Sequence, residues 1–111
     1  MRSLVFDEIS PDDMKKLETW LIEQDLQSPI EHLYHFTLPT RLLTPTQQEH
    51  ADQCGPFHMA VETGRDWVRL ELLVVPKAVL RCACIAYATP EQRAHMENYL
   101  ENLFRDLDIA I

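Results

Sequence analysis

The stretch that decides the fold is residues 57–75, "FHMAVETGRDWVRLELLVV", in which apolar and polar side chains alternate on both sides of a polar turn. Alternation with a period of two is typical of strands that bury one face. Pairing Glu62 with Trp67 across "TGRD" (63–66) gives every large apolar residue to one face of an antiparallel hairpin. The cross-strand pairs that this register predicts are Val61–Val68, Met59–Leu70 and Phe57–Leu72.

A third strand is predicted at 81–88, "RCACIAYA", after a turn near "PKAV". Keeping the same faces requires Val74 to lie opposite Cys82, which assigns both Cys82 and Cys84 to the core face. Two further strands are predicted at 4–9 and 32–38. The second of these overlaps "SPIEHLYHF", which also fits a helix with a capping box, and we favour the strand.

Three short motifs, "SPDD" (10–13), "TPTQ" (44–47) and "TPEQ" (89–92), predict helix starts. Each has a hydroxyl side chain at the N-cap, proline at the first helical position and an acid or amide at the third. The last helix carries an apolar stripe, and Gly55-Pro56 ends the middle one. The prediction is a single α+β domain over residues 1–111, a two-layer sandwich of a mostly antiparallel sheet of four or five strands with the first and last helices on one face.

The composition limits the possible partners. The net charge is -8, and the sequence contains no run of Lys or Arg. Nucleic acid and anionic membrane surfaces bind clustered basic residues, so neither is an expected partner. The N-terminal residues lack the apolar core of a signal peptide, and three cysteines do not form a disulfide framework. We therefore expect a cytoplasmic protein with reduced thiols.

Four soft side chains form a candidate metal site. His50 and Cys54, four residues apart, share a face of the middle helix, while Cys82 and Cys84 share a strand face. Two such pairs are the right donor set for zinc, although structural zinc sites usually draw thiolates from a Cys-x2-Cys turn. The alternative interpretation, and the one we favour from sequence, is that the cysteines are small core residues and that there is no cofactor.

Two catalytic hypotheses are alternatives to a non-enzymatic role. Cys54 as a nucleophile with His50 as base is disfavoured, because the negative end of a helix dipole raises a thiol's pKa. The second uses His58, which points away from the core and is predicted to lie opposite Glu71 as an acid–base pair. A solvated ion pair is the simpler interpretation of these two residues.

The outer face of the sheet has the composition of a protein interface. Aromatic, aliphatic and arginine side chains gather there, as in the centres of many interfaces. The leading functional hypothesis is therefore a non-catalytic cytoplasmic binding or regulatory domain that forms a homo-oligomer through this face, unless another part of the same chain covers it. The predicted interaction residues are Trp67, Arg69, Leu73, Ile85 and Tyr87.

Overall fold

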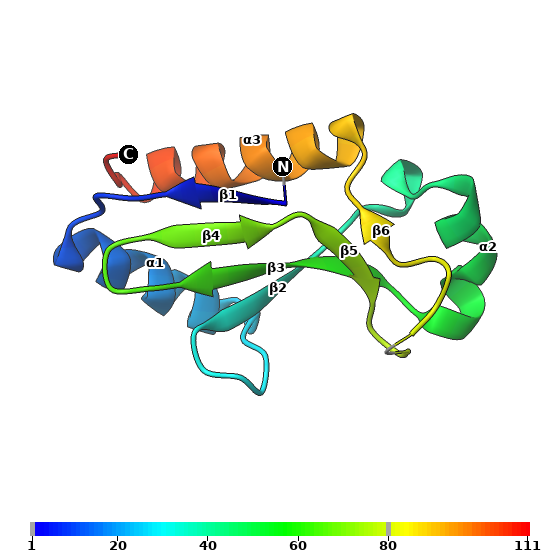
Figure 1. Cartoon of the computed structure of the whole chain (residues 1–111). Coiled ribbons are helices and arrows are strands. Elements are labelled where there is room, and N and C mark those ends of the chain that lie inside the picture. Colours follow the sequence, from blue (N-terminus) through cyan, green and yellow to red (C-terminus); the bar gives the residue numbers. More distant parts are fainter. Residues whose placement is uncertain (1, 80) are drawn as a thin grey trace.

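A computed structural model describes residues 2–79 and 81–111 and contains three α-helices and a mainly antiparallel sheet (Figure 1). The strands are β1 (Ser3–Phe6), β2 (Leu33–Thr37), β3 (Phe57–Thr63), β4 (Val68–Glu71), β5 (Leu73–Pro76) and β6 (Ala86–Tyr87). The helices are α1 (Pro11–Glu23), α2 (Pro45–Cys54) and α3 (Pro90–Asp106), with a 3-10 turn, η1 (Thr40–Leu42), before α2.

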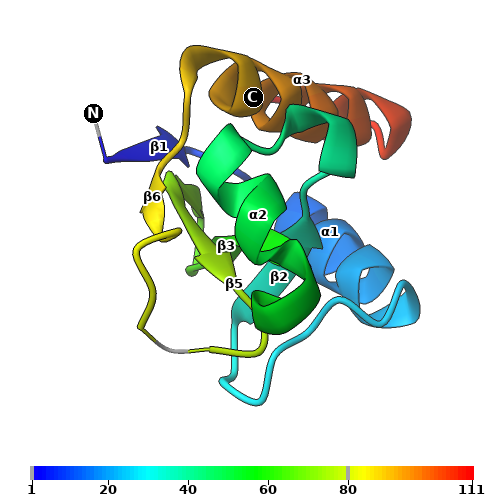
Figure 2. The same ribbon diagram turned by 90° about the vertical axis from the view of Figure 1, so that its right-hand side faces the viewer.

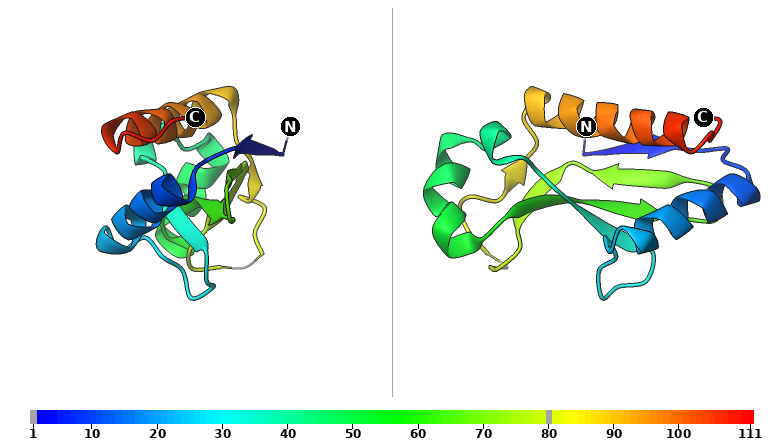
Figure 3. Two further views of the ribbon diagram at one scale, coloured as in Figure 1. Left: turned by 90° about the vertical axis from the view of Figure 1, so that its left-hand side faces the viewer. Right: turned by 180° about the vertical axis from the view of Figure 1, so that it is seen from behind.

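Helices α1 and α3 cover one face of the sheet, as the end-on views show (Figures 2 and 3). Each helix turns an apolar stripe toward the strands, and the alternate residues of β3 and β4 complete the core. The predicted two-layer α+β arrangement is confirmed. The largest fully buried apolar side chains are Phe57, Phe104, Leu17, Leu21, Met59, Leu70, Met96 and Leu100.

The three helix starts are also confirmed. Ser10 accepts a hydrogen bond from the Asp13 backbone N–H at 3.2 Å, and Thr44 and Thr89 each form a full capping box. Helix α2 ends at Cys54, directly before the Gly55-Pro56 pair. Among the described residues, no helix has the length and apolar character that a membrane crossing requires.

The hairpin of β3 and β4 keeps the predicted faces in a different register. Val61 lies opposite Leu70, not Val68, so the predicted register is wrong by two residues. The reason is the loop, which begins at Gly64 and is closed by a hydrogen bond of 2.8 Å from its N–H to the Trp67 carbonyl. A Cβ at Gly64 would overlap the Trp67 indole ring. Because a shift of two residues preserves side-chain parity, the buried face is unchanged.

The predicted strand over 67–75 is divided at Leu72, which gives the sheet six strands instead of the predicted four or five. The Leu72 N–H donates to the Arg2 carbonyl at 3.0 Å, and the Leu72 carbonyl accepts from the Ala88 N–H at 2.7 Å. Beyond this point β5 pairs with β3 in a shifted register, with His58 opposite Val75. The chain is therefore bent at Leu72, where it has two more residues than the facing part of β3.

The last strand differs most from its prediction. Strand β6 is two residues long, and Val74 lies opposite Ala86, not Cys82. The cysteines precede β6 in a turn in which the Ile85 N–H donates to the Cys82 carbonyl at 3.2 Å. The prediction that they lie on a strand is wrong, because the observed β5–β6 register differs from the predicted one by four residues and leaves the cysteines in the turn before β6.

Strand β2 is confirmed over the alternative helix. It pairs with β3, with Tyr34 opposite Val61. The Ser28 hydroxyl accepts from the Ile30 N–H at 3.1 Å within a turn. This turn leads into β2, so the segment after Ser28 supplies an edge of the sheet instead of a further helix.

Candidate metal centre

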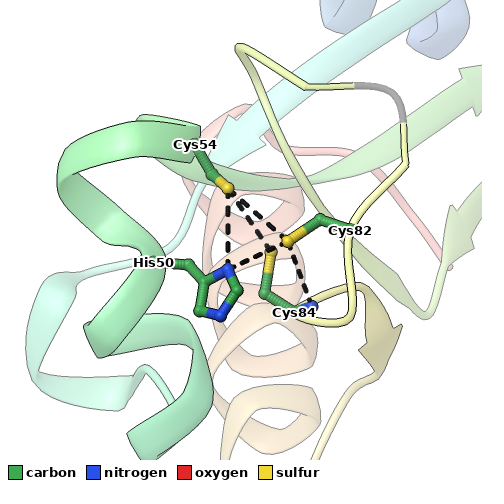
Figure 4. A group of neighbouring side chains, drawn as sticks. All are labelled: His50, Cys54, Cys82 and Cys84. Carbon is green, nitrogen blue, oxygen red and sulfur yellow. Dashed lines mark hydrogen bonds between the residues drawn. The ribbon is translucent and has the colours of Figure 1, made fainter.

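Helix α2 and the turn before β6 bring His50, Cys54, Cys82 and Cys84 together at one end of the sheet (Figure 4). The candidate ligand atoms of the four side chains all lie within 4.8 Å of one another. The donor set proposed from sequence is thus a single cluster in space.

The backbone around Gly55 explains how the two segments meet. Gly55 has φ 84° and ψ -168°, a conformation that is essentially restricted to glycine. It turns the chain from α2 into β3, and the flanking carbonyls of Cys54 and Pro56 accept hydrogen bonds of 2.9 Å from the N–H groups of Ala78 and Lys77. The segment that leads to the two later cysteines is therefore fixed against the end of α2.

Three of the separations are close to those of ligands around one tetrahedral ion, and the fourth, from His50 to Cys82, is shorter. The sulfur of Cys54 lies 3.6 Å from that of Cys82 and 3.8 Å from that of Cys84. Nδ1 of His50 lies 3.0 Å from the Cys82 sulfur and 3.9 Å from the Cys54 sulfur. Tetrahedral zinc bonds imply sulfur–sulfur distances of about 3.8 Å and sulfur–nitrogen distances of about 3.6 Å. The described thiols are also free, with no disulfide among them.

The three thiols have different environments. Burial raises the pKa of Cys54 and raises that of Cys84 to about 12, the opposite of what a cysteine nucleophile needs. Hydrogen bonds from the Cys84 thiol and backbone N–H hold the pKa of Cys82 lower, at about 7. That N–H lies 3.4 Å from the Cys82 sulfur. An N–H donated to a sulfur is a typical outer-shell contact of a thiolate ligand.

A buried pair of glutamines is hydrogen-bonded to the backbone of the cluster. Gln47 donates through Nε2 to the Cys84 carbonyl at 3.4 Å. Its Oε1 accepts from Gln92 Nε2 at 3.0 Å, and Gln92 also donates to the Leu42 carbonyl at 2.9 Å. Sequence reasoning identified both glutamines as cap residues and missed their contact. The repeated Thr-Pro-x-Gln motif was the available signal.

The predicted acid–base pair is not formed. His58 lies opposite Val75 in β5, whereas Glu71 lies opposite Ser3 in β1 and pairs with Arg69 Nε at 3.1 Å. The shifted β3–β4 register is the first reason, since it would place Glu71 opposite Ala60, and the bend at Leu72 moves β5 by two further residues. His58 instead stacks on His35, with ring centroids 4.0 Å apart.

The predicted interaction residues lie mainly on the sheet surface away from α1 and α3. The Arg69 guanidinium is 5.2 Å from the Trp67 ring centroid and pairs with Glu62 and Glu71. Leu73 is half-buried opposite Tyr87, which is 45% exposed. Ile85, also half-buried, belongs to the turn before β6 and not to a strand. Self-association through this surface stays a prediction.

Comparisons of the chain with protein-family models, curated proteins and solved structures found no match. Function is therefore argued from the cluster itself. Three sulfurs and one imidazole nitrogen can supply all four positions of a tetrahedral ion, the arrangement of structural zinc sites.

Proposed function

We propose that this chain is a zinc-binding domain in which His50, Cys54, Cys82 and Cys84 hold one Zn²⁺. The observation that carries the proposal is the set of four ligand atoms within 4.8 Å, with sulfur–sulfur separations of 3.6 and 3.8 Å. The group brings three thiols and one imidazole from two separate segments of the chain to one place, which is the complete donor set of a four-coordinate zinc site. Thiolates and imidazole in a tetrahedral arrangement are typical zinc ligands.

The role of the zinc in this proposal is structural. Four protein donors fill the coordination sphere and leave no position for a substrate, whereas catalytic zinc sites keep one position open. The ion joins α2 to the turn at 82–85, two segments far apart in the chain. This supports a non-catalytic binding or regulatory domain, in which the zinc fixes the shape of one end of the sheet.

Elemental analysis tests this proposal. The chain is produced in zinc-containing medium without a histidine tag, and we expect one zinc per chain after gel filtration. Cys84→Ser removes a buried thiolate and should abolish stoichiometric zinc. His50→Ala should weaken zinc binding by at least about tenfold.

His95→Ala is the matched control, because His95 lies on α3 outside the cluster. It should retain the zinc content of the unmodified chain. Zinc far below stoichiometric in the unmodified, reduced protein would contradict the proposal. Equal zinc in all variants would also contradict the assignment of these ligands.

A further inference from the structure

A second site is marked by a cavity that shares no residue with the metal cluster. Its volume is about 280 Å³, which is below the roughly 300–1,000 Å³ of pockets for drug-sized ligands. It lies between the segment after α1 and the ends of β2, β3 and β5. The polar lining residues include Asp25, Gln27, His35, Thr37, His58 and Lys77.

Two stacked imidazole rings form part of this cavity. The rings of His35 and His58 are 4.0 Å apart at an interplanar angle of 16°. Their residues alternate with buried ones along β2 and β3, so both side chains point away from the core. No hydrogen bond found within residues 2–79 and 81–111 uses a ring nitrogen of either histidine, which leaves these nitrogens free to bind a ligand.

The charges around the rings favour an anion over a cation. Burial, together with His35 and Lys77, lowers the pKa of His58 to about 4, and burial and Lys77 lower that of His35. Both rings are therefore neutral at pH 7, beside one lysine ammonium. Asp25 is the one carboxylate among the described lining residues. Lys77 repels a metal ion, whereas an anion would be attracted to it and would favour protonated histidines.

We propose that this cavity binds a small oxyanion, a phosphate or carboxylate group, between Lys77 and the His35–His58 pair. The anion accepts hydrogen bonds from the ammonium and from an imidazole that takes up a proton from solvent as the anion binds. No covalent bond changes in this step. The proposal does not rest on the zinc site, because the two sets of residues are separate.

Histidine side-chain NMR tests the proposal on the full chain. The pKa values of His35 and His58 are measured with inorganic phosphate, with succinate and with sodium chloride at the same ionic strength. A ligand at ten times its dissociation constant for the protonated state raises the pKa by about one unit. We expect such a rise for His58 with phosphate, succinate or both, and none with chloride.

Lys77→Gln tests the contact, with Lys15→Gln as the control that removes the same charge from the exposed surface of α1. The first should weaken anion binding at least about tenfold, because it removes a charge-assisted hydrogen bond, and the second should leave it unchanged. A shift with one probe alone identifies the group that is bound. Histidine pKa values that match the chloride control with both probes would overturn the proposal, as would equal binding by both lysine variants. Because zinc content is measured separately, a failure here is distinguishable from a failure of the zinc proposal.

Discussion

At the scale of single residues, His58 links pH to stability. Its pKa is lowered from 6.5 to about 4 in the folded chain, mainly by burial. Between these two values the unfolded chain binds more protons, so the folded state loses stability as pH falls from about 7 toward 4. After allowance for its partial exposure, we expect His58 to contribute a loss of about 1–2 kcal/mol.

Urea denaturation at a series of pH values, in the absence of added anions, measures this effect. His58→Gln should lose less stability over this pH range than the unmodified chain, because glutamine does not titrate. Comparing the two proteins cancels the acid sensitivity of the metal ligands and carboxylates. Parallel pH profiles would show that His58 is not held neutral by the fold.

The donor residues themselves could be found from sequence. The spacing of His50 and Cys54 places them on one helical face, and Cys82 and Cys84 are close neighbours in any conformation. Sequence could not show that the later pair lies in a turn, because that depends on the β5–β6 register, which local patterning does not set. At Leu72 the N–H donates to the Arg2 carbonyl and the carbonyl accepts from the Ala88 N–H, two partners that are distant in the chain.

At the scale of elements, the capping boxes of α2 and α3 are hydrogen-bonded to each other. Gln47 and Gln92 each occupy the third position of their helix, and each is about 1% exposed or less. The oxygen and the nitrogen of both amides have hydrogen-bond partners, in the other glutamine, the caps and the carbonyls of Leu42 and Cys84. Buried polar groups that are satisfied in this way fix one arrangement of the elements.

Gln92→Leu should therefore destabilise the chain by about 2–4 kcal/mol, because it leaves buried donors and acceptors without partners. Chemical denaturation measures the change. Gln53→Leu is the control, since Gln53 is exposed near the end of the same helix as Gln47. Similar stability of the two variants would contradict the proposed role of the glutamine pair.

The sheet shows which properties of an element are readable in its sequence. Alternation along β3 and β4 gives the buried face correctly, because parity survives a shift of two residues. The register itself depends on how the Trp67 ring packs over Gly64, a contact with no signature in hydrophobic periodicity. The helix starts are predicted best, since their caps are entirely local.

At the scale of the whole molecule, the zinc site lies at one end of a fold with its own apolar core. We expect chelation to lower the melting temperature without unfolding the sheet. Free zinc at about a thousand times its dissociation constant would stabilise the folded chain by about 4 kcal/mol. Hydrogen exchange should show lost protection in α2 and residues 77–88 after chelation, and retained protection in β3 and β4. Uniform loss of protection would contradict this division.

Self-association remains the prediction for the outer face. Val5 of β1 is 55% exposed and lies opposite Arg69. Tyr87 of β6 is 45% exposed. Burial of these side chains between two copies would remove apolar surface from water. Light scattering over a range of concentrations should show a dimer that Tyr87→Glu disrupts. A monomer at every concentration would rule out this prediction.

The most direct test of the central claim is X-ray absorption spectroscopy at the zinc edge of the purified, reduced chain. The account predicts one zinc per chain with three sulfur ligands at about 2.3 Å and one nitrogen ligand at about 2.0 Å. Cys84→Ser should remove that signal or change its sulfur count. A first shell made of oxygen and nitrogen alone, or no bound zinc, would contradict the account.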